Sequence, residues 1–472
     1  MTFTFNNSYR FNSTVWLSIF ITSITLVCYN GYWDVLTFSR DDHFTISGGY
    51  GTTLYQHIVN TIDWLVDIQS RYQPFRLSLF VFFIRTFPEE YSVYYNIGLH
   101  IINLLVLIPV LRKFNLNPLY IFIIATYFSL FGRNRYMDSA SSTIAGAEMY
   151  ILFILLTLYF LIKAIESTSR NKKIIFLTCS YLLYLSIVFS YEVAYPFFLL
   201  IVFVFIFFNY QHHSFQVFKR VKEYLVLVPY LLFLIIYLFF FRLPVQGGSY
   251  GGSTVTFGLH NLLQFQTYFV GSMTFQIRPG DDYSFRWEWL AFLFLYYLFL
   301  FIFLSLTKED SGKKVHELFN KKDSLNFLLF SALFFFTTII LFSINKGIAP
   351  GSFMAQHAYS FTFGSSLFTV SLLFYLQFFF PAVARQKYIR FLIYIFFPLV
   401  CLIGLNFNLK LAESQQVRSE EMTKMKMGLR EKIKDIKEID AIIIKNFKYP
   451  YYYITSVNAA FIVWFDYSKY IH

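Results

Sequence analysis

An adjacent pair of carboxylates, Asp41 and Asp42, directly follows the first apolar segment, between Arg40 and His43. Neighbouring carboxylates repel each other, which favours keeping a proton on one, while Arg40 favours ionisation of the other. Such a pair can exchange a proton near neutral pH. The structural alternative is that the pair caps or solvates a helix end. Asp-Asp-His also suggests a divalent metal site, but three adjacent residues rarely reach one ion, so we expect no metal and no other cofactor.

Arginine and histidine side chains recur in connections between apolar segments. A guanidinium group binds phosphate oxygens in bidentate fashion, and a histidine beside a phosphate stabilises a departing oxygen. We therefore predict a phosphate-bearing ligand held by Arg71, Arg133, Arg135, Arg278 and His357. The alternative for Arg71 is an anchor for lipid headgroups, and for His357 it is solvation in a loop spanning 344–360.

A second group of residues suits the recognition of a hydroxylated acceptor or sugar. Carboxylates accept hydrogen bonds from hydroxyls and aromatic rings stack on sugar faces. The group comprises Glu192, Asp281, Asp282, Tyr283 and Trp287. Because Glu192 lies between two apolar segments with almost no loop, we favour its pairing with an outward arginine over orientation of the acceptor. The aromatic residues alternatively form a belt at the membrane surface.

The composition is typical of an integral membrane protein. Of 472 residues, 57% are hydrophobic, 22% aromatic and 14% charged, and the mean hydropathy is +0.52. These values leave too few polar residues to cover a water-facing surface. The net charge of +12 comes from short connections, which indicates a topological bias, so we predict no nucleic-acid partner. The three cysteines lie in apolar runs without metal-ligand spacing and are predicted to be packing residues.

Eleven apolar segments approach the length of about 20 residues that a membrane-crossing helix needs. They are 14–32, 92–111, 117–132, 147–163, 174–190, 194–209, 223–241, 288–306, 325–343, 361–383 and 389–405. A twelfth segment, 75–87, is interrupted by Arg76 and Arg85 and indicates a helix at the membrane interface. Helical spacing of apolar residues over 54–68 predicts an amphipathic surface helix, which Pro74 separates from the next.

Alternate connections are rich in lysine and arginine, as cytoplasmic loops are. They are 112–113, 163–173, 219–222, 313–322 and 385–390. The N-terminus is then predicted to be cytoplasmic and the C-terminus periplasmic.

Two regions follow from this topology. Residues 1–405 are predicted to form a membrane domain with outward loops 33–91 and 242–287, and residues 406–472 a small outward tail. An amphipathic helix over 411–439 and strands near 451–455 and 460–465 are expected in that tail. The predicted fold class is an all-α polytopic membrane protein with a small α/β tail.

Asn96, His100 and Asn103 share one stripe of a predicted membrane helix because they are spaced at i, i+4 and i+7. Polar side chains in membrane helices face protein rather than lipid. We favour hydrogen bonding between helices as their role, since one histidine makes no ligand set.

Together these features resemble the GT-C superfamily of membrane glycosyltransferases. They are the acidic pair, the surface helix, the Arg-Tyr-Gln-Pro-Phe-Arg segment at 71–76, the polar stripe and an outward arginine after the next helix. The pattern is most similar to bacterial members that use polyprenyl-phosphate sugars, such as serotype-converting glucosyltransferases that decorate O-antigen. The likeness covers roughly the first 165 residues. Beyond them only the hydropathy and an outward tail agree.

The resemblance implies an inverting glycosyltransferase of the bacterial inner membrane. Asp41 or Asp42 would be the general base on the acceptor hydroxyl, and the lipid phosphate of the donor would leave. The implied partners are a polyprenyl-phosphate sugar donor, a surface glycan acceptor of the lipopolysaccharide type and membrane lipids.

Two other classes of function remain open. An O-antigen-type polymerase would depend more on the arginines of 242–287 than on the acidic pair. A lipid-linked glycan flippase or other transporter is the third class. Ion-coupled transporters keep ionisable groups near the bilayer midplane, whereas the apolar segments here are nearly free of them.

Overall fold

The computed structural model describes residues 7–32, 52–69, 73–86, 92–131, 147–190, 195–213, 221–242, 286–311, 320–343 and 350–433. The regular elements in these ranges are all helices, which confirms the helical part of the predicted fold class. The predicted strands near 451–455 and 460–465 lie outside the described residues.

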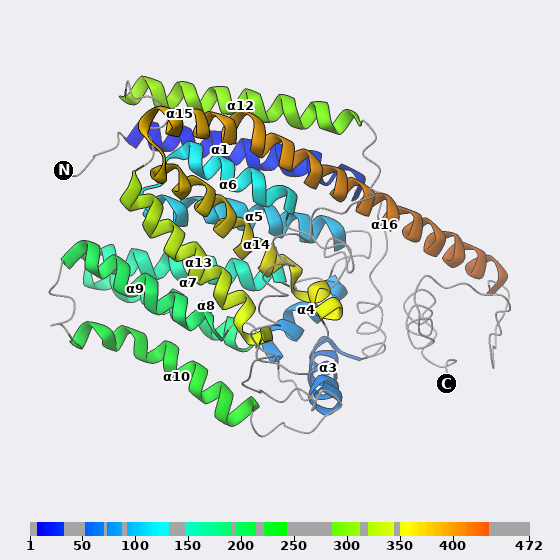
Figure 1. Ribbon diagram of the computed structural model, residues 1–472. Coiled ribbons are helices and arrows are strands. Elements are labelled where there is room, and N and C mark those ends of the chain that lie inside the picture. The colour runs from blue at the N-terminus through cyan, green and yellow to red at the C-terminus, as the bar shows by residue number, and fades with distance from the viewer. Residues whose placement is uncertain are drawn as a thin grey trace.

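The helices run back and forth as a bundle of nearly antiparallel rods (Figure 1). Pairs that follow each other in the chain pack together, notably α7 with α8 and α13 with α14. The bundle helices are α1 (Asn7–Cys28), α5 (Ser92–Lys113), α6 (Pro118–Phe131), α7 (Ala147–Glu166), α8 (Arg170–Val188), α9 (Phe197–His213), α10 (Val228–Ile236), α12 (Trp287–Ser311), α13 (Lys321–Ser343), α14 (Pro350–Leu376) and α16 (Phe397–Ile433). Short 3-10 turns (η5, Val221–Leu227) and π turns (η6, Tyr237–Arg242) extend α10 at its two ends.

Seven helical segments in the described part of the chain are long and apolar enough to cross a membrane. They are Val93–Lys113, Glu148–Glu166, Arg170–Val188, Glu223–Phe241, Trp287–Ser305, Lys321–Ile340 and Ala382–Lys410. The other four predicted segments coincide with shorter apolar helices at Ser13–Cys28, Pro118–Ser129, Phe197–Gln211 and Phe363–Phe379. The helices therefore fit a membrane protein, and eleven crossings stays a prediction.

The bundle has two chemically different ends. At one end, which we call the lysine end, α5 finishes beside α7, and Lys113 forms an ion pair with Glu166 at 2.5 Å. Arg112 of α5 donates a hydrogen bond to Ser13 near the start of α1 at 2.7 Å. The opposite end, which we call the acidic end, holds the last residues of α1 and the first turns of α5, α7 and α12 (Figure 1). The basic residues Arg112 and Lys113 thus lie at the end of the bundle opposite to the first turns of α5, α7 and α12.

Helix α6 lies in the middle of the bundle. From Leu119 to Ser129 each of its side chains is at most 8% exposed. Its rings contact aromatic rings of several other helices: Phe122 lies 4.6 Å from Phe20 of α1 and 5.3 Å from Tyr296 of α12 between centroids. Further pairs join Tyr120 to Phe374 of α14 and Tyr127 to Phe397 of α16. A helix that is apolar on all sides is expected at such a central position.

The three cysteines are packing residues, as predicted. Cys28 and Cys401 are buried, Cys179 is partly buried, and none is in a disulfide.

Two short helices, α3 (Leu54–Gln69) and α4 (Pro74–Thr86), form a hairpin at the acidic end. Arg85 at the end of α4 donates a hydrogen bond to the carbonyl of Thr52, just before α3, at 2.8 Å. Helix α3 runs across the direction of the bundle helices (Figure 1). Both helices were predicted, and the break before Pro74 is confirmed. The transverse direction suits the interfacial position predicted for them.

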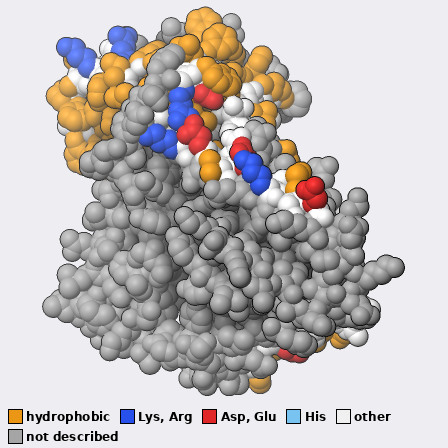
Figure 2. Space-filling model, turned by 90° about the vertical axis from the view of Figure 1, so that its right-hand side faces the viewer, with side chains coloured by type: hydrophobic (Ala, Val, Ile, Leu, Met, Phe, Trp, Pro, Cys, Tyr) orange, Lys and Arg blue, Asp and Glu red, His pale blue; other side chains and the backbone are white. Residues whose placement is uncertain are grey.

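Helix α16 begins in the bundle, after α15 (Ala382–Phe391) and a π turn, and continues past the acidic end (Figure 1). Its first half is buried through Cys401, Leu405 and Ala412. Figure 2 looks onto the acidic end and shows acidic and basic side chains in a row along the later part of α16, where Glu420 and Lys424 lie 3.9 Å apart. The helix is continuous across residue 405, where the tail was predicted to begin.

The predicted loop 344–360 is wrong over its second part, because α14 already begins at Pro350. Proline has a fixed φ suited to the first helical position and lacks the N–H that would be unsatisfied there. His357 therefore lies in a helix rather than in a loop.

Close packing of α13 on α14 predicts that Gly364→Ala destabilises the protein. A Cβ atom at Gly364 would lie 3.0 Å from the Cα of Phe335 and 3.2 Å from Oγ1 of Thr338. Such overpacking costs about 1–3 kcal/mol. We expect a lower free energy of unfolding for the purified protein in detergent.

The matched control is Gly98→Ala, because a Cβ atom there meets nothing within 4 Å. Alanine favours helix over glycine by about 1 kcal/mol, so this variant should be as stable as the wild type or more so. Equal destabilisation by both changes would contradict the packing of α13 on α14.

Candidate functional site

Most of the predicted site residues lie in segments that the structure does not describe. These residues are Asp41, Asp42, Arg71, Arg133, Arg135, Glu192, Arg278, Asp281, Asp282 and Tyr283. For His357 the structure gives the backbone, within α14, but not the side chain. Trp287 is the first residue of α12, and its side chain is 59% exposed.

The described helix ends on either side of those segments lie at the acidic end, spread across the width of the bundle (Figure 1). The segment with Asp41 and Asp42 joins Tyr32 to the residues before α3, and the segment with Arg133 and Arg135 joins α6 to α7. The segment with Glu192 joins α8 to α9, and the one with Arg278 ends at α12. The bundle therefore attaches these segments to one and the same end.

A stripe of buried polar residues lies beneath this end. Asn96, His100 and Asn103 of α5 are each 0% exposed. The side-chain amide of Asn103 donates a hydrogen bond to the backbone carbonyl of Glu148, in the first turn of α7, at 2.9 Å. The predicted hydrogen bonding between helices is thus confirmed for Asn103.

His100 is held between aromatic rings. Its imidazole lies 5.6 Å from the ring of Tyr29, which directly follows α1, and 5.1 Å from the ring of Phe128 in α6, measured between centroids. Tyr29 in turn packs against Tyr32, at 5.7 Å. Since Tyr32 is the last described residue before the acidic pair, the histidine lies beneath the point where that segment leaves the bundle.

Two acidic residues are buried at the acidic end, each in the first turn of a helix. Glu148 of α7 is 2% exposed and Glu288 of α12 is 9% exposed. Asn30 approaches Glu288 with a long hydrogen bond of 3.5 Å. The partial positive charge of a helix N-terminus stabilises a carboxylate there, which offsets part of the cost of burial.

A bidentate ion pair joins α12 to α16 at the same end. The guanidinium of Arg286 contacts both carboxylate oxygens of Glu413, at 2.5 and 3.1 Å. Glu413 is half exposed, so the pair is screened by solvent. The pair lies where α16 passes the entry of α12.

The chain was compared with protein-family models, with curated proteins and with solved structures. None of them matches. The resemblance to GT-C enzymes therefore depends on the residues quoted above.

The described part of this site offers amides, an imidazole and carboxylates in a water-poor setting. Such groups bind hydroxyls and transfer protons. No three His, Cys, Asp or Glu side chains among the described residues are grouped so as to hold a metal ion.

Two features of the site were missed by the sequence analysis. Glu148 and Glu288 were not predicted as site residues, although both lie in the first turn of an apolar helix, where a carboxylate is favoured and becomes buried as helices pack. The pairing of Arg286 with Glu413 spans 127 residues of sequence, and no local pattern indicates a contact of that kind.

We predict that Asn103→Leu weakens the contact between α5 and α7. The leucine keeps the volume but removes the hydrogen bond to the carbonyl of Glu148, and such bonds between membrane helices contribute about 1 kcal/mol. Chemical unfolding in detergent should show a loss of this size.

Ser186→Ala is the control, because that hydroxyl bonds only to the Leu182 carbonyl of its own helix, at 2.9 Å. This change should leave stability almost unchanged. If Asn103→Leu were as stable as Ser186→Ala, the hydrogen bond would not contribute to packing.

Proposed function

We propose that this protein is an inverting membrane glycosyltransferase. It would move a sugar from a polyprenyl-phosphate donor to a cell-surface glycan, at the membrane face where the acidic end lies. In the bacterial cell this face would be periplasmic and the acceptor a glycan of the O-antigen or lipopolysaccharide type.

The observation that carries the proposal is the common attachment of the predicted site segments. The helix ends that flank the segments with Asp41, Asp42, Arg133, Glu192 and Arg278 lie at the acidic end, spread across the width of the bundle (Figure 1). A reaction between a lipid-linked donor and a water-soluble acceptor requires an acid or base, phosphate-binding cations and sugar-binding groups on one side of the membrane. Their assignment to one end of the bundle meets that requirement.

The buried stripe supports the same assignment. His100 packs against Tyr29, three residues before the last described residue ahead of the acidic pair, and both His100 and Asn96 are fully buried. Polar groups buried in a membrane helix are costly and are kept where they hold the structure or serve a site.

The proposed reaction has one displacement step. Asp41 or Asp42 takes the proton from an acceptor hydroxyl, and the hydroxyl oxygen attacks the anomeric carbon of the donor sugar. The bond from that carbon to the phosphate oxygen breaks, and the configuration inverts. Arg71, Arg133, Arg135, Arg278 and His357 would bind the departing lipid phosphate, while Glu192, Asp281, Asp282, Tyr283 and Trp287 would bind sugar and acceptor. The reaction needs no cofactor.

One observation bears on the polymerase alternative. A polymerase would use the arginines of 242–287, and Arg286 is already engaged in a bidentate ion pair with Glu413. A flippase or transporter differs in outcome, because it moves lipid-linked glycan across the bilayer without forming a glycosidic bond.

The test replaces Asp41 and Asp42 singly with asparagine and measures sugar transfer from a polyprenyl-phosphate donor in membranes. Asparagine keeps the shape but cannot accept the proton. We expect the variant of the true base to lose about 10²–10⁴-fold in rate, and the other variant to lose less.

Asp63→Asn is the matched control, because Asp63 is an exposed carboxylate on α3 at the same end. It should retain full activity. Full activity in both acidic-pair variants would end the assignment of the base. Movement of donor across the bilayer without a new glycosidic bond would favour the flippase.

A further inference from the structure

A stripe of exposed side chains follows the helical run from α15 through the π turn η9 (Leu392–Phe396). It comprises Lys387, Arg390, Phe391, Tyr394 and Ile395. Their spacing of i, i+3, i+4, i+7 and i+8 is that of one helix face. Ile389, Leu392 and Ile393, on the other side of the run, are buried. The run therefore turns the stripe away from the bundle.

Two tyrosines of α12 hold the run in this rotation. The hydroxyl of Tyr296 donates to the carbonyl of Ile393 at 2.7 Å, and the hydroxyl of Tyr297 donates to the carbonyl of Tyr394 at 2.8 Å. Both bonds reach the π turn, where the regular backbone bonding of an α-helix is interrupted. Tyr297 is itself 42% exposed, so the stripe lies beside a contact at the outer surface of the bundle.

The depth of the two cations follows from the apolar stretch beside them. Helix α15 lies at the lysine end (Figure 1), and the 19 residues between Arg390 and Lys410 carry no charge. At about 1.5 Å per residue they rise roughly 28 Å, close to the hydrocarbon thickness of about 30 Å. A crossing by this stretch places Arg390 at the edge of the hydrocarbon and Lys387 about 4.5 Å further out, among lipid headgroups.

Both cations are available to a ligand. The ion pairs between described residues involve neither Lys387 nor Arg390. The sequence has no acidic residue between Asp323 and Glu413. Side chains three positions apart are neighbours on a helix surface, so one phosphate group can contact both Lys387 and Arg390.

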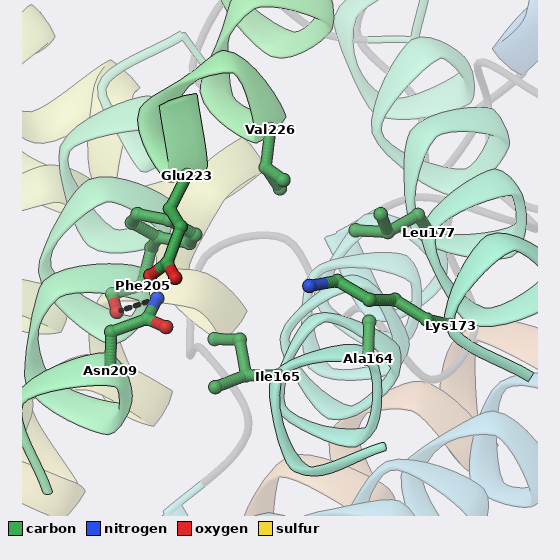
Figure 3. Close-up of a pocket in the computed structure, with 8 residues that line it drawn as sticks. All are labelled: Ala164, Ile165, Lys173, Leu177, Phe205, Asn209, Glu223 and Val226. Carbon is green, nitrogen blue, oxygen red and sulfur yellow. Dashed lines mark hydrogen bonds between the residues drawn. The ribbon is translucent and has the colours of Figure 1, made fainter. Parts of the chain in front are cut away.

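Helix α8 begins at the same end with further cations, but it arranges them differently. Figure 3 shows Lys173 pointing into a small hollow between α7, α8, α9 and η5. The hollow has room for little more than a water molecule. Lys172 is exposed, and the residues one turn from it on either side are uncharged. It therefore lacks the neighbouring cation that α15 provides.

We propose that Lys387 and Arg390 bind the phosphate of an anionic phospholipid of the phosphatidylglycerol type. The planar guanidinium of Arg390 contacts two phosphate oxygens, and Lys387 adds a second positive charge from the headgroup side. The acyl chains lie along Phe391, Tyr394 and Ile395. A zwitterionic lipid carries a cation of its own, which these two side chains repel. The order of cations above apolar side chains favours a lipid over a soluble phosphate. This inference is independent of the proposed function.

The test titrates the full-length protein in detergent with phosphatidylglycerol or phosphatidylcholine and measures bound lipid by native mass spectrometry. The wild type should bind phosphatidylglycerol more tightly. Arg390→Gln should weaken phosphatidylglycerol binding about tenfold, as expected for the loss of a bidentate charge-assisted contact. Lys387→Gln should weaken it about threefold, as for an exposed charge pair. Both changes should affect phosphatidylcholine less.

Lys172→Gln is the matched control, because it removes the same charge from an exposed position at the same end of the bundle. It should leave phosphatidylglycerol binding unchanged. Thermal unfolding checks that each variant is folded, and if Arg390→Gln does not fold, the exposed Lys387 decides the test.

Three outcomes would overturn the proposal. Equal binding of the two lipids by the wild type would exclude recognition of an anionic headgroup. Equal losses in Lys172→Gln and in the α15 variants would indicate general attraction by surface charge. Displacement of phosphatidylglycerol by equimolar glycerol phosphate would indicate a soluble phosphate ligand in place of a lipid.

Discussion

The structure depends on how aromatic rings fit around α6. In hydrocarbon, apolar side chains gain little by leaving the solvent, so helices are selected by shape and by close contact rather than by hydrophobicity. Rings from α1, α12, α14 and α16 meet those of α6, with Phe128 and Phe363 at 4.5 Å between centroids. Close contact is also achieved at Gly364, where the absence of a side chain lets α14 approach the backbone of α13.

Polar groups are then confined to places where the bundle can satisfy them. Glu148 and Glu288 are buried in first helical turns, where backbone N–H groups lack partners within the helix. Asn103 connects α5 to α7 through a backbone carbonyl. The lysine end instead places its cations near solvent, with Lys113 and Glu166 each about a quarter exposed. The two ends thus differ in how their charged groups are buried.

Much of this fold could be predicted from the sequence. Hydropathy indicates where the helices form, and the positions of lysine and arginine indicate which helix ends lie on the same side of the bundle. All eleven predicted apolar segments coincide with helices. The loop around His357 was wrong because a proline at position 350 starts a helix, a choice that hydropathy does not reveal. The burial of Glu148 depends on which helices become neighbours. Asp41, Asp42 and the predicted arginines remain predictions, since they lie outside the described ranges.

Helix α16 is one continuous α-helix from Phe397 to Ile433, so its outer half extends from the bundle as an ordered element. An α-helix rises about 1.5 Å per residue, so Ile433, the last residue of α16, lies roughly 40 Å from Leu405 along the helix axis. The ion pair of Arg286 with Glu413 lies near the start of this outer half of α16, so a displacement of the outer half would act first on the entry of α12.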